Sequence, residues 1–346
     1  MNRDQLTGRQ CYFLLFLFMM GNLITANGAK GKQSGWLLFL VLSVLSVPVF
    51  YLFASAAKNC PAGQIFVRSF GKKLGSIVTV AYCILAILLA GDAIRLFADF
   101  IVINDLNDAG AWGNTALLTL TVLLLLFCNM QSLGKAAWIL QPLAQVLLLF
   151  SFVLTVPKMD LHRLLPLFAE TPVNLLKSGI GSFTALLASA IFPIYVMSGA
   201  APKSWKISLL AAGATACIVM AALTFRDAAV LGFPAVSMFR FPSFTAASML
   251  RHSELLIAAV FVASQPFRTA LLLRYVQACL TEFRPRWSRW YPPILLGLAV
   301  LSGTLSWSSE QVRWRTTGEL IVSLLLLAGP LSVLITDKVK GMKKKA

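Results

Sequence analysis

Charged side chains are scarce in this sequence. Asp, Glu, Lys and Arg make up 12% of its 346 residues, whereas soluble domains carry about 25%. Apolar residues make up 58%, so a soluble globule of this composition would expose large apolar patches. The scarcity of charge excludes an ordinary soluble fold. Apolar runs continue nearly end to end and predict a single all-α, polytopic membrane domain over residues 1–346.

Residues that build metal centres and disulfide frameworks are also few. The two histidines, His162 and His252, lie far apart, and the six cysteines show no Cys-x-x-Cys spacing. This pattern predicts neither a zinc site nor a disulfide framework. We also find no nucleophile–base pair, phosphate-binding loop or paired-carboxylate site. We therefore expect no metal, no cofactor and no enzymatic activity.

Acidic residues are much rarer than basic ones, which gives a net charge of +17 from 30 Lys and Arg against 13 Asp and Glu. The sequence has no basic, aromatic-interleaved soluble module, so we expect no nucleic-acid partner. The basic residues lie between apolar segments, where they meet anionic lipid headgroups and orient helices. They concentrate on the side that carries the termini, and the 338–345 segment is rich in lysine. Both termini are therefore predicted to be cytoplasmic, in a multi-pass integral membrane protein.

Ten apolar segments have the character of membrane spans. They cover residues 11–29, 36–57, 74–103, 111–127, 136–156, 179–199, 207–223, 255–280, 292–306 and 319–336. Five fall in 11–156 and five in 179–336, and an odd number of spans per half makes the halves insert with opposite topology. This predicts a 5+5 inverted repeat, the LeuT-like transporter arrangement.

The first apolar segment of each half is interrupted by helix-breaking residues. The first segment is interrupted at 21–28, with Gly21, Asn22 and Gly28, and the sixth at 189–195, around Pro193. Broken backbone at membrane depth is tolerated where it lines a cavity or a neighbouring helix. Inverted-repeat transporters hold their substrates at two such breaks. We expect a small ligand between helices 1 and 6; the alternative for the first break is a small-residue seam for close helix packing.

Polar groups near these breaks are the candidate ligand contacts. They are Gly21, Asn22, Thr25 and Asn27 in the first segment, Thr184, Ser189 and Tyr195 in the sixth, and Ser264 and Gln265 in the eighth. The last two precede Pro266, which frees a backbone carbonyl one turn earlier, or else simply kinks the helix.

Intramembrane charges are the candidate gating or ion-pair residues, because an ionised group in lipid must pair or face water. Asp92, Arg95 and Asp99 share one helix face at i,i+3 and i,i+4 spacing. They either neutralise one another and lock helix packing or form part of a gate. Glu254 and Arg268 belong to the eighth segment and its approach. The 224–254 connection is expected to be a cap over the outer mouth or an interfacial loop.

Several short motifs follow one another along the chain: Leu6-Thr7-Gly8-Arg9-Gln10, Lys32-Gln33-Ser34-Gly35-Trp36, Phe70-Gly71-Lys72-Lys73-Leu74-Gly75 and Ile94-Arg95-Leu96-Phe97-Ala98-Asp99-Phe100-Ile101. In this order they resemble the B subunit of spore germinant receptors, the GerAB-like germination permeases, and the resemblance covers most of the chain. The resemblance implies a ten-helix fold of the amino acid–polyamine–organocation type. It also implies residence in the spore inner membrane, with the termini on the core side.

The same resemblance implies a complex with a larger A subunit and a lipoprotein C subunit, in which this subunit binds a nutrient, often an amino acid. The residues themselves leave three functions open. The chain is a nutrient-sensing subunit, a secondary amino-acid transporter in which Asp92, Asp99 and Glu254 titrate, or a scaffold that binds nothing.

Overall fold

The computed structural model describes residues 5–23, 34–57, 60–103, 110–165, 189–200, 205–232, 242–248, 254–305 and 325–339. Within these ranges the chain forms helices and no strands. The α-helices are α1 (Gly8–Leu23), α2 (Gly35–Ala57), α3 (Gln64–Phe70), α4 (Lys72–Ile103), α5 (Gly110–Phe127), α6 (Met130–Thr155), α8 (Ile191–Ser198), α9 (Trp205–Leu231), α11 (Pro242–Ser248), α12 (Glu254–Phe283), α13 (Tyr291–Leu305) and a helix over 325–339. Short 3₁₀ turns are η1 (Val156–Lys158), η2 (Leu161–Leu164) and η4 (Pro285–Trp287).

Six helices are long and apolar enough to cross a membrane: α2, α4, α5, α6 with its 3₁₀ extension, α9 and α12. This confirms the all-α membrane class predicted from composition. The predicted total of ten spans includes segments that lie partly outside the described residues, so that number stays a prediction.

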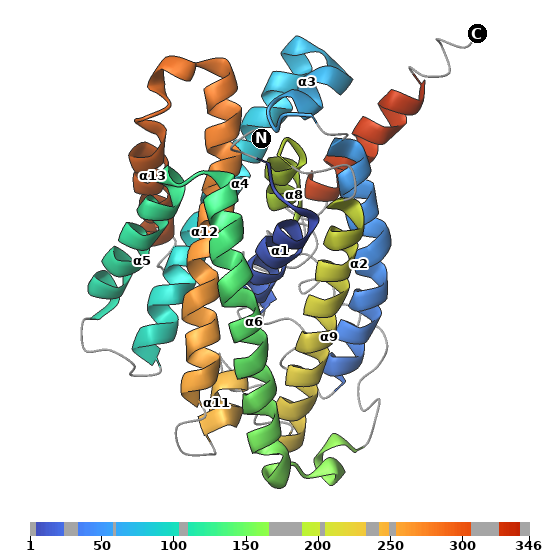
Figure 1. The fold of residues 1–346 in the computed structure, drawn as a ribbon, viewed down its shortest axis with the longest axis vertical. Helices are drawn as coiled ribbons and strands as arrows, with labels where there is room; N and C mark the ends of the chain where they lie inside the picture. The colour runs from blue at the N-terminus through green and yellow to red at the C-terminus, as the bar shows by residue number, and fades with distance from the viewer. Residues whose placement is uncertain are drawn as a thin grey trace.

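Helix α1 occupies the centre of the bundle (Figure 1), where it contacts α6, α9 and α12. Every residue from Leu14 to Met20 is fully buried, as expected of a helix that is apolar on all sides. Helix α12 is also interior, with 67% of its most apolar window buried, against 28% for α5 and α6. The helices that carry the broken and kinked segments are therefore surrounded by protein.

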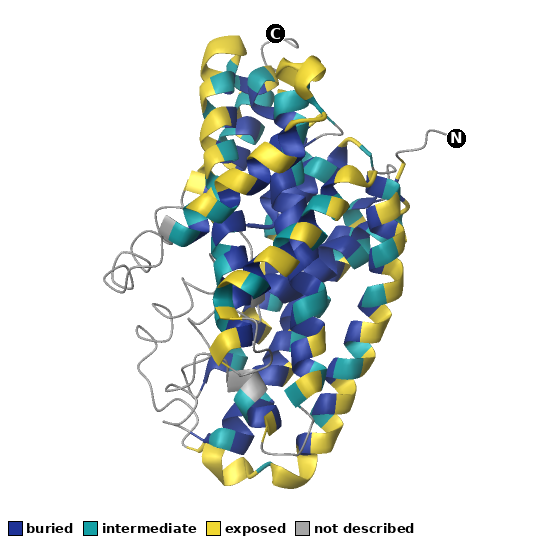
Figure 2. Cartoon of the chain, turned by 90° about the vertical axis from the view of Figure 1, so that its left-hand side faces the viewer, coloured by how far each residue is buried: buried dark blue, intermediate teal, exposed yellow. Residues whose placement is uncertain are grey.

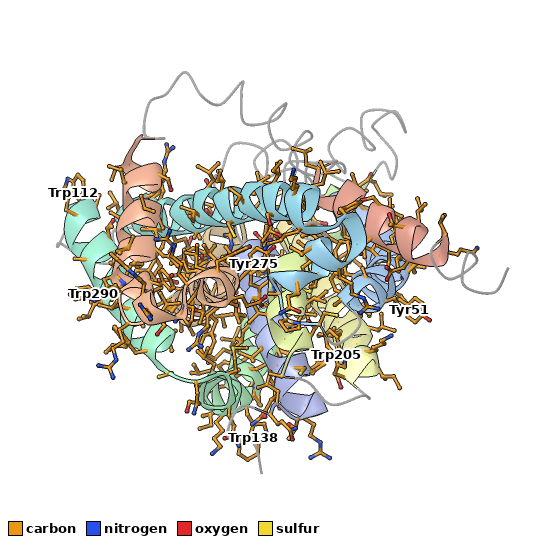
Figure 3. All side chains as sticks on the ribbon, turned by 90° about the horizontal axis from the view of Figure 1, so that it is seen from above. Tyr51, Trp112, Trp138, Trp205, Tyr275 and Trp290 are labelled. Carbon is orange, nitrogen blue, oxygen red and sulfur yellow. The ribbon has the colours of Figure 1, made fainter. Side chains whose placement is uncertain are left out.

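The peripheral helices carry exposed residues along their outer faces (Figure 2). Many of the exposed side chains are apolar, and Val44, Ile77 and Ile207 are more than 60% exposed. Seen from above, Tyr51, Trp112, Trp138 and Trp290 lie at the rim, whereas Trp205 and Tyr275 lie inside (Figure 3). An apolar belt with exposed aromatic anchors is typical of a surface that faces lipid.

One predicted boundary is wrong by two helical turns. The seventh span was expected to end at 223, with Arg226 and Asp227 in the connection that follows, but α9 continues to Leu231 and buries both side chains. The two charges neutralise each other within the helix, so they do not mark its end.

Candidate functional site

The carboxyl end of α1 lies directly against α12. A Cβ atom at Gly21 would stand 3.2 Å from the backbone oxygen of Ser264 and 3.4 Å from the Cβ of Arg268. Only a residue without a side chain allows this approach without displacement. The Gly21 carbonyl accepts hydrogen bonds from Gln265 Nε2 at 2.6 Å and from Arg268 Nη1 at 3.4 Å. Cationic and amide donors thus satisfy the carbonyl end of a helix, where the macrodipole is negative.

The same end of α1 meets the start of α8. Asn22 Nδ2 donates a hydrogen bond to Ser189 Oγ, and both residues are buried. Ser189 precedes α8, which begins at Ile191, so its hydroxyl lies beside the amino end of that helix. Two helices far apart in sequence therefore end and begin at one buried point, and α12 closes its side.

Five residues make up what we call the polar cluster: the Gly21 carbonyl and the side chains of Asn22, Ser189, Gln265 and Arg268. Its four side chains are at most 4% exposed. No described residue donates a hydrogen bond to Gln265 Oε1. Ser264 lies alongside, but its hydroxyl donates to the Phe261 carbonyl of its own helix at 3.0 Å. The cluster offers donors, acceptors and a guanidinium in a site screened from water, the combination that orients small polar ligands.

Aromatic side chains lie on both sides of the polar cluster along α12. Before it, Phe261 packs on Phe100 and Phe97 of α4, with ring centroids 4.2 and 6.3 Å apart. After it, Tyr275 packs on Phe192 at 5.1 Å and on Tyr195 at 6.5 Å. The polar cluster is therefore enclosed between two aromatic layers, one toward each end of the bundle.

Sequence reasoning placed Tyr195 at the second break, whereas the structure places it inside α8, in the aromatic layer with Tyr275. Pro193 lies in the first turn of α8, where a missing backbone N–H leaves no hydrogen bond unmade. Within the predicted break at 189–195, the described turn lies at Ser189 and Ala190. The candidate contacts Thr25, Asn27 and Thr184 lie outside the described residues.

Of the predicted gating residues, Arg268 belongs to the polar cluster, and Arg95 and Asp99 lie together on α4. Arg95 Nε is 3.7 Å from Asp99 Oδ2 on α4, with the two side chains 23% and 15% exposed. Asp92 stands three residues earlier, and helical geometry turns this face away from Phe97. Glu254 begins α12, and its buried Oε2 has no hydrogen-bond partner among the described residues.

Sequence reasoning missed a buried ion pair on α9. Arg226 Nη2 lies 2.6 Å from Asp227 Oδ1, and Arg226 Nη1 donates to Ser151 Oγ of α6 at 3.0 Å. Arg226 is 0% and Asp227 1% exposed. One signal in the sequence could have revealed this pair. Arg226 and Asp227 are adjacent and oppositely charged, so they can neutralise each other inside an apolar helix without another partner.

Comparison with solved structures identifies the fold. The structure of MhsT in complex with L-phenylalanine matches with a TM-score of 0.61 and 14% identity, covering 97% of this chain and 99% of that one. The Eremococcus coleocola manganese transporter, in complex with an aromatic bis-isothiourea substituted compound, matches with a TM-score of 0.59 and 15% identity, covering 95% of this chain and 76% of that one. These similarities confirm the predicted LeuT-like transporter fold; the division into two five-helix repeats stays a prediction.

No curated protein matches the chain in sequence. The family model described as spore germination protein matches residues 5–275. This range contains α1, α8, the polar cluster and most of α12. The resemblance inferred from the short motifs is thereby confirmed, and the chain belongs to the spore germination protein family, as an integral membrane protein of the permease type.

Proposed function

We propose that this chain is the nutrient-sensing membrane subunit of a spore germination receptor, and that it binds an amino acid or similar molecule between α1, α8 and α12. The proposal rests above all on Arg268, a buried guanidinium held against the Gly21 carbonyl near the carboxyl end of α1. An ionisable group inside a membrane bundle is a functional candidate by default, because its burial is costly.

The chemistry of the polar cluster suits a zwitterion. A ligand carboxylate would meet the Arg268 guanidinium and the amino end of α8, which both favour negative charge. A ligand ammonium would meet the carbonyls at the end of α1 and the Gln265 amide oxygen. The similar fold of MhsT was solved with L-phenylalanine bound, which supports an amino acid as the ligand class.

Ligand binding would carry information by selecting one conformer of the bundle. A ligand that replaces the hydrogen bond between Asn22 and Ser189 changes how α1 sits against α8. Its differential affinity for the two arrangements sets the size of the shift. We propose that A and C subunits read this shift, and that the receptor resides in the spore inner membrane with the termini on the core side.

Secondary transport of an amino acid is the second candidate, since both similar structures have a transporter fold. Proton coupling would use Asp92, Asp99 or Glu254, and the buried Glu254 Oε2 is the observation that favours it. Uptake of labelled amino acids into liposomes containing the purified chain separates the two functions. Saturable accumulation that collapses with the proton gradient indicates transport, and binding without accumulation indicates sensing.

Spores carrying single substitutions test the sensing role. Asn22→Leu removes the donor to Ser189 and should raise the nutrient concentration for half-maximal germination at least about tenfold. Asn114→Leu is the matched control, since Asn114 is equally buried, at 3%, but lies on α5 outside the polar cluster. Receptor subunit levels are measured alongside. An unchanged nutrient response in Asn22→Leu spores would reject this binding site and favour a scaffold.

A further inference from the structure

An apolar groove of about 270 Å³ runs along the outside of the bundle between α4, α12 and α13. Its walls include Ile84 of α4, Leu280 of α12 and Leu298 of α13. Ile84 is 54% and Leu298 45% exposed, so the groove opens on the outer, lipid-facing surface. It is separate from the polar cluster, none of whose residues lines it.

The groove has the dimensions of a lipid chain. Its α4 wall extends from Thr79 to Ile87, about 12 Å at 1.5 Å per residue. One leaflet contributes about 15 Å of a hydrocarbon core roughly 30 Å thick. Inside a bilayer an apolar recess facing hydrocarbon is filled by hydrocarbon, because no polar group in it binds water.

Cationic side chains gather at one end of the groove. Phe283 and Tyr291 both line it, and the connection between them carries Arg284, Arg286 and Arg289. The Tyr291 hydroxyl donates to the Arg284 carbonyl at 2.8 Å, which folds this connection across the end of the groove. All three arginines are exposed.

Two lysines complete the charged end. Lys72 and Lys73 begin α4 and are exposed. They precede the groove residues Thr79 and Val80 by seven positions. This spacing places them on the same face of α4, about two turns nearer its amino end.

The only acid in 72–87 and 276–298 is Glu282. Its Oε1 accepts a hydrogen bond from the Gly63 N–H at 3.2 Å, so it is engaged at the α2–α3 connection. Five cations against one acid make this end of the groove attractive to a phosphate.

We propose that the groove is a binding site for an anionic phospholipid, with one acyl chain between α4, α12 and α13 and the phosphate held by the arginines of 284–289 and by Lys72 and Lys73. The exposed rings of Trp287 and Trp290, 54% and 65% exposed, lie in the same connection and suit the headgroup level.

Native mass spectrometry of the delipidated full chain tests this site, with phosphatidylglycerol and phosphatidylcholine of identical acyl chains as probes. The wild-type chain should bind one phosphatidylglycerol at least about tenfold more tightly than phosphatidylcholine. The triple variant R284Q/R286Q/R289Q should lose this preference. Ile84→Trp, which fills the groove from an exposed position, should weaken binding of both lipids, and Leu298→Trp does the same from the opposite wall.

The matched control is R9Q/K135Q/K206Q, which removes three charges from the same end of the bundle but away from the groove. It should keep the phosphatidylglycerol preference. Equal loss in both triple variants would overturn the proposal in favour of general charge attraction. Wild-type binding without headgroup preference, or undiminished binding by both Trp variants, would overturn it too. Thermal unfolding midpoints confirm that each variant is folded.

Discussion

At the scale of single residues, charge inside this bundle is tolerated where it is matched at contact distance. Arg226 satisfies its guanidinium with Asp227 and Ser151, and Arg268 donates to the Gly21 carbonyl. The two arginines differ in what surrounds them. Arg226 has the Asp227 carboxylate beside it, and Arg268 lies against the carbonyl at the end of α1.

Removing one member of the Arg226–Asp227 pair should be more damaging than removing both. Arg226→Met leaves a buried carboxylate and should cost about 3–5 kcal/mol of stability, whereas replacing both residues with apolar ones, Arg226→Met with Asp227→Leu, should recover most of the loss. Thermal unfolding of the purified variants in detergent measures both. A single variant as stable as the wild type would show that the pair carries no structural role.

At the scale of helices, close crossings depend on glycine. At Gly91 of α4 a Cβ would stand 2.6 Å from the Ala299 carbonyl oxygen and 2.8 Å from the Gly303 nitrogen of α13, and both of these are backbone atoms. Gly303 faces Gly91 in return, with a Cβ position 2.7 Å from the Gly91 carbonyl oxygen. These two helices also form two of the groove walls, so their spacing sets the groove width.

Gly91→Val should push α13 away from α4 and lower stability by about 1–3 kcal/mol, the usual cost of overpacking. Gly297→Ala on α13 is the control, because its Cβ would meet no described atom within 4 Å. It should be neutral or stabilising by up to about 1 kcal/mol. Unfolding midpoints compare the two, and equal effects would mean that the crossing has room for a side chain.

The sequence predicts helices where apolar residues run unbroken. Gly21 and Asn22, at the start of the predicted first break, lie inside α1, and 24–28 lie outside the described residues. Of the predicted second break, 189–195, Ser189 and Ala190 form a turn, whereas the rest lies inside α8, because Pro193 fits the first turn of that helix. The hydrogen bonds between Asn22 and Ser189 and between Gln265 and the Gly21 carbonyl join residues more than 160 positions apart in sequence. They depend on how the helices pack. No local pattern encodes such contacts.

At the scale of the whole molecule, the first and last described residues lie at the same end of the bundle (Figure 1). The Leu6 N–H donates to the Ala200 carbonyl at 2.8 Å, which ties the start of the chain to the end of α8. The same end carries η4 and its arginines, while η1 and η2 lie at the opposite end. This polarity agrees with the excess of basic residues on the predicted cytoplasmic side.

Cysteine labelling tests that orientation. Cys128 is exposed at the α5–α6 junction, at the end that carries the termini. A membrane-impermeant maleimide should label it in inverted vesicles and leave it unlabelled in intact cells. Lys158→Cys at the opposite end should show the reverse in a Cys128→Ser background. Labelling of Cys128 from outside intact cells would invert the proposed topology.

The most direct test of the central claim is calorimetric titration of the purified chain with a panel of amino acids that includes L-phenylalanine. We predict saturable binding of at least one ligand, weakened about tenfold or more by Arg268→Met. Arg274→Met on the same helix, where Arg274 donates to the Leu125 carbonyl of α5 at 3.2 Å, should leave the affinity unchanged. A folded chain that binds no ligand, or an Arg268→Met variant that binds as tightly as the wild type, would contradict a nutrient site between α1, α8 and α12.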